Sequence, residues 1–85
     1  MPRKKKVEIT DNQFDLFLVQ VGARLKDFRL EAGYTSYEQF AYEHEIGRAQ
    51  YGKYERGTED LRLSSLYKIL KKMDIPFEDF FKGIK

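Results

Sequence analysis

The chain contains no cysteine and only one histidine, and these absences exclude several kinds of protein. Without cysteine, neither disulfides nor a thiolate-bound metal can stabilise the fold. The single histidine, His44, stands between Glu43 and Glu45, a set that falls short of the usual ligands of a zinc site. The sequence shows no serine–histidine–aspartate set and no phosphate-binding loop. We therefore predict no catalysis, no metal and no cofactor.

Long apolar runs are also missing. No segment has 18 consecutive apolar residues, so none is predicted to span a membrane. The basic start MPRKKK is followed by polar VEITDNQ, whereas a secretory signal would need an apolar stretch there. We therefore expect a cytoplasmic protein. Its 85 residues suffice for one domain with a small core, and seven Phe and six Tyr can supply core volume.

Positive charge is concentrated near the start of the chain. Residues 3–6 supply four of the 16 basic residues, which leaves 12 basic against 14 acidic residues from Val7 onward. Affinity for nucleic acid must then come from local patches or from this segment. We predict a flexible basic arm over residues 1–9 and a folded domain over residues 10–85. The arm could contact DNA phosphates or enter a minor groove beside the binding site. It also resembles a nuclear-import signal. The remaining alternative is a tail that only keeps the protein soluble.

Apolar residues recur at three- to four-residue spacing along most of the chain, which predicts an all-α protein with five helices. The first helix begins at a capping box formed by Thr10 and Gln13 and ends at Gly33. Thr35 or Ser36 caps the second helix. The predicted helices cover about residues 10–33, 36–44, 47–56, 63–73 and 76–81.

The segment from Tyr37 to Gly57 carries the main functional signal, because it reads as two short helices joined by a tight turn. On a helical wheel, tyrosines occupy one side of the second of these helices. The opposite side carries Ala49, Gly52, Lys53 and Arg56. A basic, small-residue face of this kind suits a helix that enters the major groove of DNA. A glycine there costs about 0.5–1 kcal/mol relative to alanine and suggests a surface that must be approached closely. The alternative is a solvated face with an incidental glycine.

The chain resembles the phage repressor/Cro-type (XRE-like) helix-turn-helix regulators from about Val21 to Phe81. The matching steps are Val21-Gly22-x-x-Leu25, Arg29, Phe40-Ala41, Ile46, Tyr51, Tyr54-Glu55-Arg56-Gly57 and Leu63-x-x-Leu66. The resemblance implies a compact five-helix bundle of the lambda-repressor-like type, with a long first helix and the helix-turn-helix at the second and third. It also implies a sequence-specific transcriptional regulator, most simply a repressor that binds double-stranded DNA as a homodimer.

The same resemblance implies roles for individual residues. Those expected to face base edges are Arg48, Ala49, Gln50 and Lys53. Those expected to meet phosphates are Ser36, Tyr37 and Arg56. A buried ion pair between Arg29 and Glu55 is expected to join the first helix to the end of the third and to hold the recognition helix at its angle. The alternative for this pair is a surface contact of little energetic worth.

Three positions depart from the family pattern. Glu45 stands where relatives usually have the turn glycine, so the turn is expected to be strained or differently shaped. His44 replaces an apolar core residue. The loop Thr58-Glu59-Asp60 is acidic where relatives often carry basic phosphate contacts, which would weaken DNA binding and its salt dependence.

Large apolar residues at both ends of the domain suggest a dimer surface or additional core. The candidates are Phe14, Phe17 and Leu18 near the start, and Phe77, Phe80 and Phe81 near the end. Two other functions stay open. One is an antitoxin-like or other protein-interaction module that uses the same fold without DNA, and the other is a structural DNA-binding protein with little sequence preference.

Overall fold

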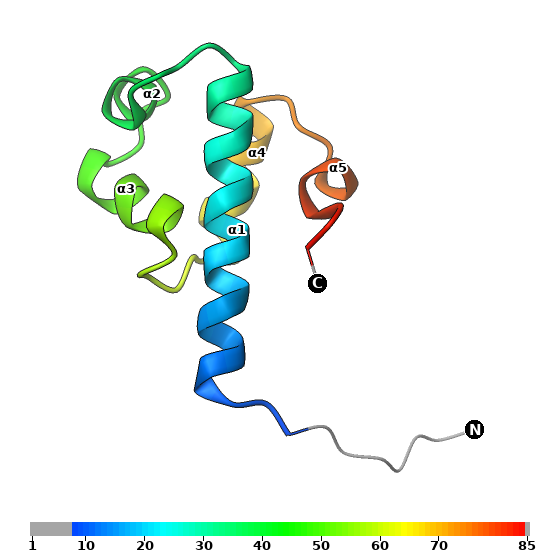
Figure 1. The fold of residues 1–85 in the computed structure, drawn as a ribbon. Coiled ribbons are helices and arrows are strands. Elements are labelled where there is room, and N and C mark those ends of the chain that lie inside the picture. Colours follow the sequence, from blue (N-terminus) through cyan, green and yellow to red (C-terminus); the bar gives the residue numbers. More distant parts are fainter. Residues whose placement is uncertain (1–7, 85) are drawn as a thin grey trace.

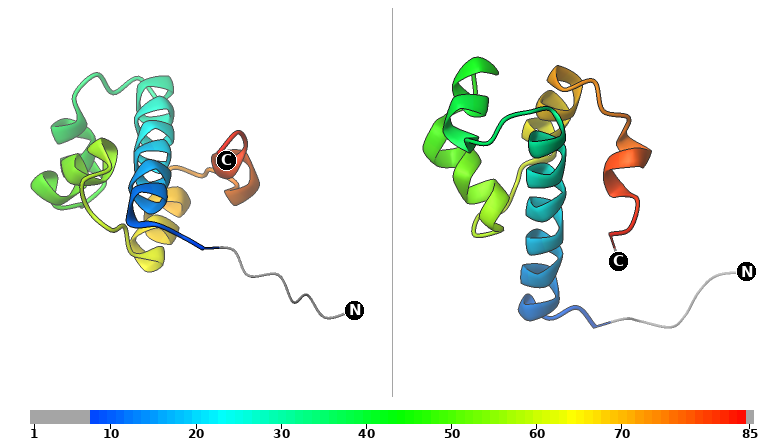
Figure 2. Two further views of the ribbon diagram at one scale, coloured as in Figure 1. Left: turned by 60° about the horizontal axis from the view of Figure 1, so that its bottom comes forward. Right: turned by 45° about the horizontal axis from the view of Figure 1, so that its top comes forward.

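A computed structural model describes residues 8–84 of the chain. The helices, in chain order, are α1 (Asp11–Glu31), α2 (Tyr37–Glu43), α3 (Arg48–Arg56), α4 (Leu63–Lys72) and α5 (Phe77–Phe81). Helix α1 is central, with α2 and α3 on one side and α5 on the other, while α4 lies behind it (Figure 1). Two further views preserve this arrangement (Figure 2). The predicted all-α, five-helix fold is confirmed.

The long helix α1 begins and ends where its sequence signals lie. The Thr10 hydroxyl accepts a hydrogen bond from the Gln13 N–H at 3.1 Å, and the Thr10 N–H donates to Gln13 Oε1 at 2.8 Å. This reciprocal pair is the predicted capping box. At the other end, Gly33 takes the left-handed conformation with φ 95°, which ends the helix. The predicted basic arm falls mainly on residues 1–7, outside the described residues.

The turn between α2 and α3 keeps a left-handed residue without using glycine. Glu45 has φ 58°, a conformation that costs a non-glycine residue about 1–2 kcal/mol. The Ile46 N–H donates to the Ala41 carbonyl at 2.8 Å and closes the turn. His44 caps α2 and stacks on Phe40 with ring centroids 4.2 Å apart. The chain therefore keeps the turn geometry and carries strain at Glu45, as the sequence suggested.

All five helices contribute to the core. Its fully buried large side chains are Leu25, Phe40, Tyr51, Leu70 and Phe80. The two helices α1 and α3 meet at Gly22, where an added Cβ would lie 2.4 Å from the Glu55 carbonyl oxygen. Only a glycine allows this approach, so Gly22 sets how closely α3 sits on α1.

Two of the six residues predicted as dimer candidates belong to the core instead. Phe80 is fully buried and packs on Phe28, and Leu18 retains 9% of its exposed surface. Phe80 is buried because α5 folds back onto α1, and Leu18 lies at the floor of a hollow lined by Phe14, Phe17 and Phe81. Arg24 of α1 holds α5 there through hydrogen bonds to the carbonyls of Asp79 and Phe80. The other four candidates stay partly exposed: Phe14, Phe17, Phe77 and Phe81.

None of the helices within residues 8–84 combines the length and the hydropathy that crossing a bilayer requires. The same residues contain no group of three or more His, Cys, Asp or Glu side chains placed to hold a metal ion.

Candidate nucleic-acid interface

Helix α3 presents most of the predicted recognition residues to the outside. Tyr51 and Tyr54 are buried against the core, which turns the opposite side of the helix outward. Arg48, Ala49 and Lys53 are exposed on that side. These positions can therefore reach a partner without any rearrangement of the fold.

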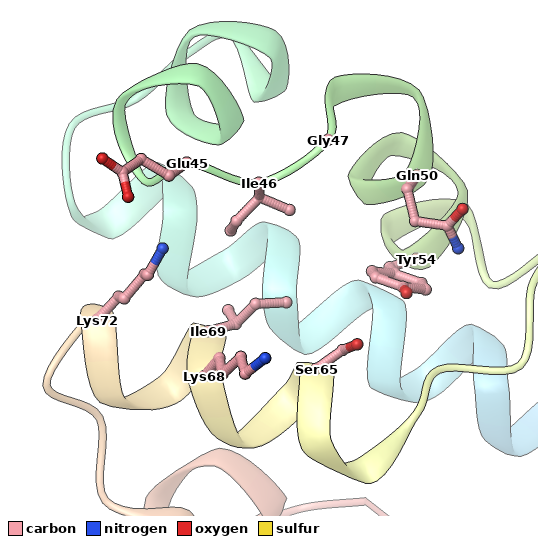
Figure 3. Close-up of a pocket in the computed structure, with 9 residues that line it drawn as sticks. All are labelled: Glu45, Ile46, Gly47, Gln50, Tyr54, Ser65, Lys68, Ile69 and Lys72. Atoms are coloured by element: carbon pink, nitrogen blue, oxygen red, sulfur yellow. The ribbon is translucent and has the colours of Figure 1, made fainter.

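Gln50 lies at one edge of this face. It lines a hollow of about 250 Å³ between the turn, α3 and α4, together with Ser65 and Lys68 (Figure 3). The amide of Gln50 therefore sits on the α4 side of the recognition face. At the far end of the hollow, Lys72 donates a hydrogen bond to the His44 carbonyl and ties α4 to the turn.

Gly52 does not lie on the outer face, which corrects the interpretation drawn from the helical wheel. It is buried, and an added Cβ would lie 2.7 Å from Cε1 of the Tyr37 ring. The close approach that a glycine permits is therefore made by Tyr37 of α2, inside the protein. The wheel could not show this, because it describes α3 alone and not the helix that packs on it.

Tyr37 and Arg56 are brought together by this packing. The Arg56 Nη1 atom lies 3.1 Å from the position of a Cβ at Gly52, next to the Tyr37 ring. The start of α2 and the end of α3 thus place a phenol and a guanidinium side by side at the edge of the recognition face. Ser36 caps α2, and its hydroxyl accepts a hydrogen bond from the Gln39 N–H at 3.2 Å.

The ion pair between Arg29 and Glu55 is present and buried. Arg29 Nε donates to Glu55 Oε2 at 2.6 Å and Nη2 donates to Oε1 at 2.9 Å, a bidentate arrangement. The Arg29 and Glu55 side chains are only 5% and 8% exposed to solvent. Arg29 Nη1 also donates to the Tyr34 carbonyl at 2.7 Å. The hydrogen bond to Glu55 raises the pKa of Arg29, so the guanidinium stays charged.

Tyr51 lies beside this pair, with its hydroxyl buried. Within residues 8–84 that hydroxyl has no hydrogen-bond partner of acceptable geometry. Burial raises the pKa of Tyr51 well above its ordinary value, and the neighbouring Glu55 carboxylate raises it further. The phenol therefore stays neutral at pH 7.

The acidic loop after α3 reaches the recognition face, a contact that sequence reasoning missed. The Lys53 ammonium lies 3.7 Å from Glu59 Oε2, with half of the lysine side chain exposed. The spacing of six residues across a helix end is not a recognisable pairing pattern. Only the path of the loop brings the two charges together.

Residues 25–80 match the family model for the helix-turn-helix. The chain belongs to the helix-turn-helix family. Membership identifies it as an XRE-like DNA-binding transcriptional regulator with an all-α fold, as the sequence predicted. A comparison with curated proteins finds no match.

Solved structures of two proteins are similar to this chain. One is the restriction-modification controller protein C.AhdI from Aeromonas hydrophila, 31% identical, with a TM-score of 0.67 over 75% of this chain and 96% of that one. The other is the wild-type restriction-modification controller protein C.Esp1396I, 30% identical, with a TM-score of 0.68 over 78% of this chain and 83% of that one.

Proposed function

We propose that this protein binds a palindromic operator as a homodimer and controls transcription there, most simply as a repressor. The observation that carries the proposal is the outward face of α3, where Arg48, Ala49 and Lys53 are exposed while a buried ion pair holds the helix from behind. A helix presented in this way fits the major groove of B-DNA. The protein would act in the cytoplasm and without a cofactor.

The chemistry of each side chain suggests its role at the DNA. Arg48, at the start of α3, is suited to bidentate hydrogen bonds with guanine O6 and N7. Ala49 is small enough to let the helix approach and can contact a thymine methyl group. Lys53 can donate to base acceptors, and Gln50 can reach an adenine from the edge of the face. We assign no catalysis to this surface.

Tyr37 and Arg56, the two side chains next to Gly52, would bind the phosphate backbone of the DNA. Tyr37 and Arg56 lie side by side at the edge of the recognition face, where one strand of the duplex would pass. A guanidinium binds phosphate strongly, and a phenol adds a neutral hydrogen bond. Ser36 would contribute through the backbone at the start of α2. These contacts set the register of the protein on DNA and carry no sequence information.

The similarity to restriction-modification controller proteins suggests which genes are regulated. We infer that this chain controls genes of a restriction-modification system. Neighbouring genes for a restriction enzyme and a methyltransferase, with an inverted repeat upstream, would support this. Neighbours of another kind would overturn it.

We propose a dimer surface on the side of the molecule away from α3. The first turns of α1 extend beyond the other helices (Figure 1). On this part of α1, Phe14 and Phe17 line an apolar hollow together with Leu63 and Phe81. Phe81, from the C-terminal candidates, thus lies beside Phe14 and Phe17, from the N-terminal ones, which supports one shared surface over two competing ones. Exposed apolar side chains from three elements at one place are typical of an interface.

This apolar surface continues along α4 to α5. Tyr67 lies one turn after Leu63 and stacks on Phe77 with ring centroids 5.6 Å apart. Helix α5 lies across α1 from α3 in all three views (Figures 1 and 2). A second copy bound here would leave both recognition helices free, as a two-fold dimer on half-sites about 34 Å apart requires.

The DNA proposal is tested with a duplex selected from a random pool and with a random duplex, each titrated at two salt concentrations. We expect tighter binding to the selected duplex. Arg48→Ala should relax the preference at one base pair by about 1–3 kcal/mol, while Arg56→Ala should weaken binding to both duplexes alike. Equal binding to both would leave a structural DNA-binding protein. No binding to either would favour a protein-interaction module, such as an antitoxin.

The dimer proposal is tested by sedimentation over a range of protein concentrations. Leu63→Glu places a charge on the proposed surface at a residue that is 79% exposed, so the fold should persist while the dimer dissociates. Leu16→Glu is the matched control, because Leu16 is also exposed but lies on the other side of α1. A wild-type protein that stays monomeric at high concentration would refute the dimer. Dissociation of both variants alike would refute this surface.

A further inference from the structure

The loop after α3 folds back on the helix it leaves. Gly57 is left-handed with φ 70°, which reverses the chain direction at the end of α3. The Thr58 N–H then donates to the Lys53 carbonyl at 3.1 Å, and the Thr58 hydroxyl lies 3.4 Å from the same oxygen. The next residue, Glu59, is thereby held alongside the last turn of α3.

This path places a carboxylate against one of the proposed base-contacting residues. Glu59 Oε2 lies 3.7 Å from Lys53 Nζ, and both side chains are partly exposed. Lys53 lies on the exposed side of α3, opposite the buried Tyr51. The ammonium that would meet DNA therefore already has a counter-charge within the protein.

We propose that Glu59 lowers the affinity of this protein for DNA by binding the Lys53 ammonium, which must leave the carboxylate before it can contact a base or a phosphate. The proposal rests on the proposed function of α3. Two effects act in the same direction: the ion pair must be broken, and the freed carboxylate then repels nearby phosphates. An exposed ion pair is weak, so the restraint amounts to about two- to fivefold in affinity.

The neighbouring Asp60 provides a matched control. It carries the same charge one residue further along and lines the same hollow as Gln50 and Glu59. Among the residues that the structure describes, it forms no ion pair with Lys53. A general repulsion between the acidic loop and DNA would involve both acids. A specific restraint on Lys53 involves Glu59 alone.

The test compares Glu59→Gln and Asp60→Asn with the wild type, in the full chain, on a selected and a random duplex. We expect Glu59→Gln to bind both duplexes about two- to fivefold more tightly. Its plot of log affinity against log salt should be steeper by up to about 0.9, since Lys53 then displaces a counterion from DNA. Asp60→Asn should change affinity less.

The same substitution in a Lys53→Gln background separates the ion pair from charge repulsion. We expect the gain from Glu59→Gln to shrink there to the size of the Asp60→Asn effect. An unchanged affinity for Glu59→Gln would overturn the proposal. So would an equal gain in both backgrounds, because the carboxylate would then act on DNA directly and not through Lys53.

A heparin column keeps this proposal separate from the DNA proposal. If no variant binds either duplex, the proposed function fails, but heparin still measures how available Lys53 is to a polyanion. We expect Glu59→Gln to elute at higher salt than Asp60→Asn. Elution of the two variants at the same salt concentration would refute the ion-pair restraint.

Discussion

Removing the buried Glu55 carboxylate should destabilise the fold far more than removing the exposed charge of Lys53. Glu55 accepts two hydrogen bonds from Arg29, at 2.6 and 2.9 Å, and both side chains are almost fully buried. In Glu55→Ala the guanidinium keeps only its bond to the Tyr34 carbonyl and stays charged in the interior. Breaking one partner of a buried pair in this way costs about 3–5 kcal/mol.

That loss is large for a domain of this size. At about 0.05–0.15 kcal/mol per residue, an 85-residue domain has roughly 4–13 kcal/mol of stability. We expect urea unfolding, followed by circular dichroism, to show a midpoint far below that of the wild type for Glu55→Ala. Lys53→Ala is the control, because that side chain is half exposed and its surface ion pair contributes at most about 1 kcal/mol.

A double variant separates stability from orientation. Replacing Arg29 and Glu55 together with leucine removes both charges, so the cost should be smaller than that of Glu55→Ala alone. DNA binding should be weak in the folded double variant, since the two hydrogen bonds that orient the end of α3 on α1 are then missing. If Glu55→Ala unfolds at the wild-type midpoint and binds the selected duplex normally, the reasoning about this pair is wrong.

Three further changes test the packing around α3 by urea unfolding. Gly22→Ala should cost about 1–3 kcal/mol, because its Cβ would crowd the Glu55 carbonyl oxygen, a backbone atom that cannot move alone. A loss below about 0.5 kcal/mol would contradict this. Glu45→Gly should stabilise the fold by about 0.5–1 kcal/mol, because glycine relieves the left-handed strain at φ 58°. The gain is smaller than the strain, since glycine also raises the entropy of the unfolded chain. A destabilised variant would show that the turn is not strained. Tyr51→Phe should leave stability at pH 7 unchanged or raise it by up to about 1 kcal/mol, since a buried hydroxyl without a partner is removed. The folded pKa of Tyr51 is raised, so the unfolded chain alone loses this proton above about pH 10. Stability of the wild type should therefore fall above that pH more steeply than stability of Tyr51→Phe, and parallel curves would refute the shift.

The helices and their ends follow from local sequence. The capping box at Thr10 and the glycines at 33 and 57 act within four residues of a helix end, so their chemistry can be read without a fold. The apolar spacing marks which side of each helix is buried, and it correctly placed Tyr51 and Tyr54 inward. These local rules determined the five helices and the outward position of Lys53.

Family resemblance supplied what spacing could not. Arg29 and Glu55 are 26 residues apart, and no periodic pattern links them. Their pairing was expected only because relatives carry such a pair, and the structure contains it. The roles of Arg48, Gln50 and Arg56 at DNA have the same origin and stay predictions.

What remained was decided by how helices pack on one another. Gly52 is covered by Tyr37, and Phe80 is buried because α5 folds back on α1. Glu59 meets Lys53 because a left-handed glycine reverses the chain. Each of these contacts joins separate elements, so its geometry depends on distances that no single helix encodes. Local patterns in the sequence account for the helices, their ends and the likeness to DNA-binding regulators, whereas the packing of the helices sets which side chains stay exposed to a partner.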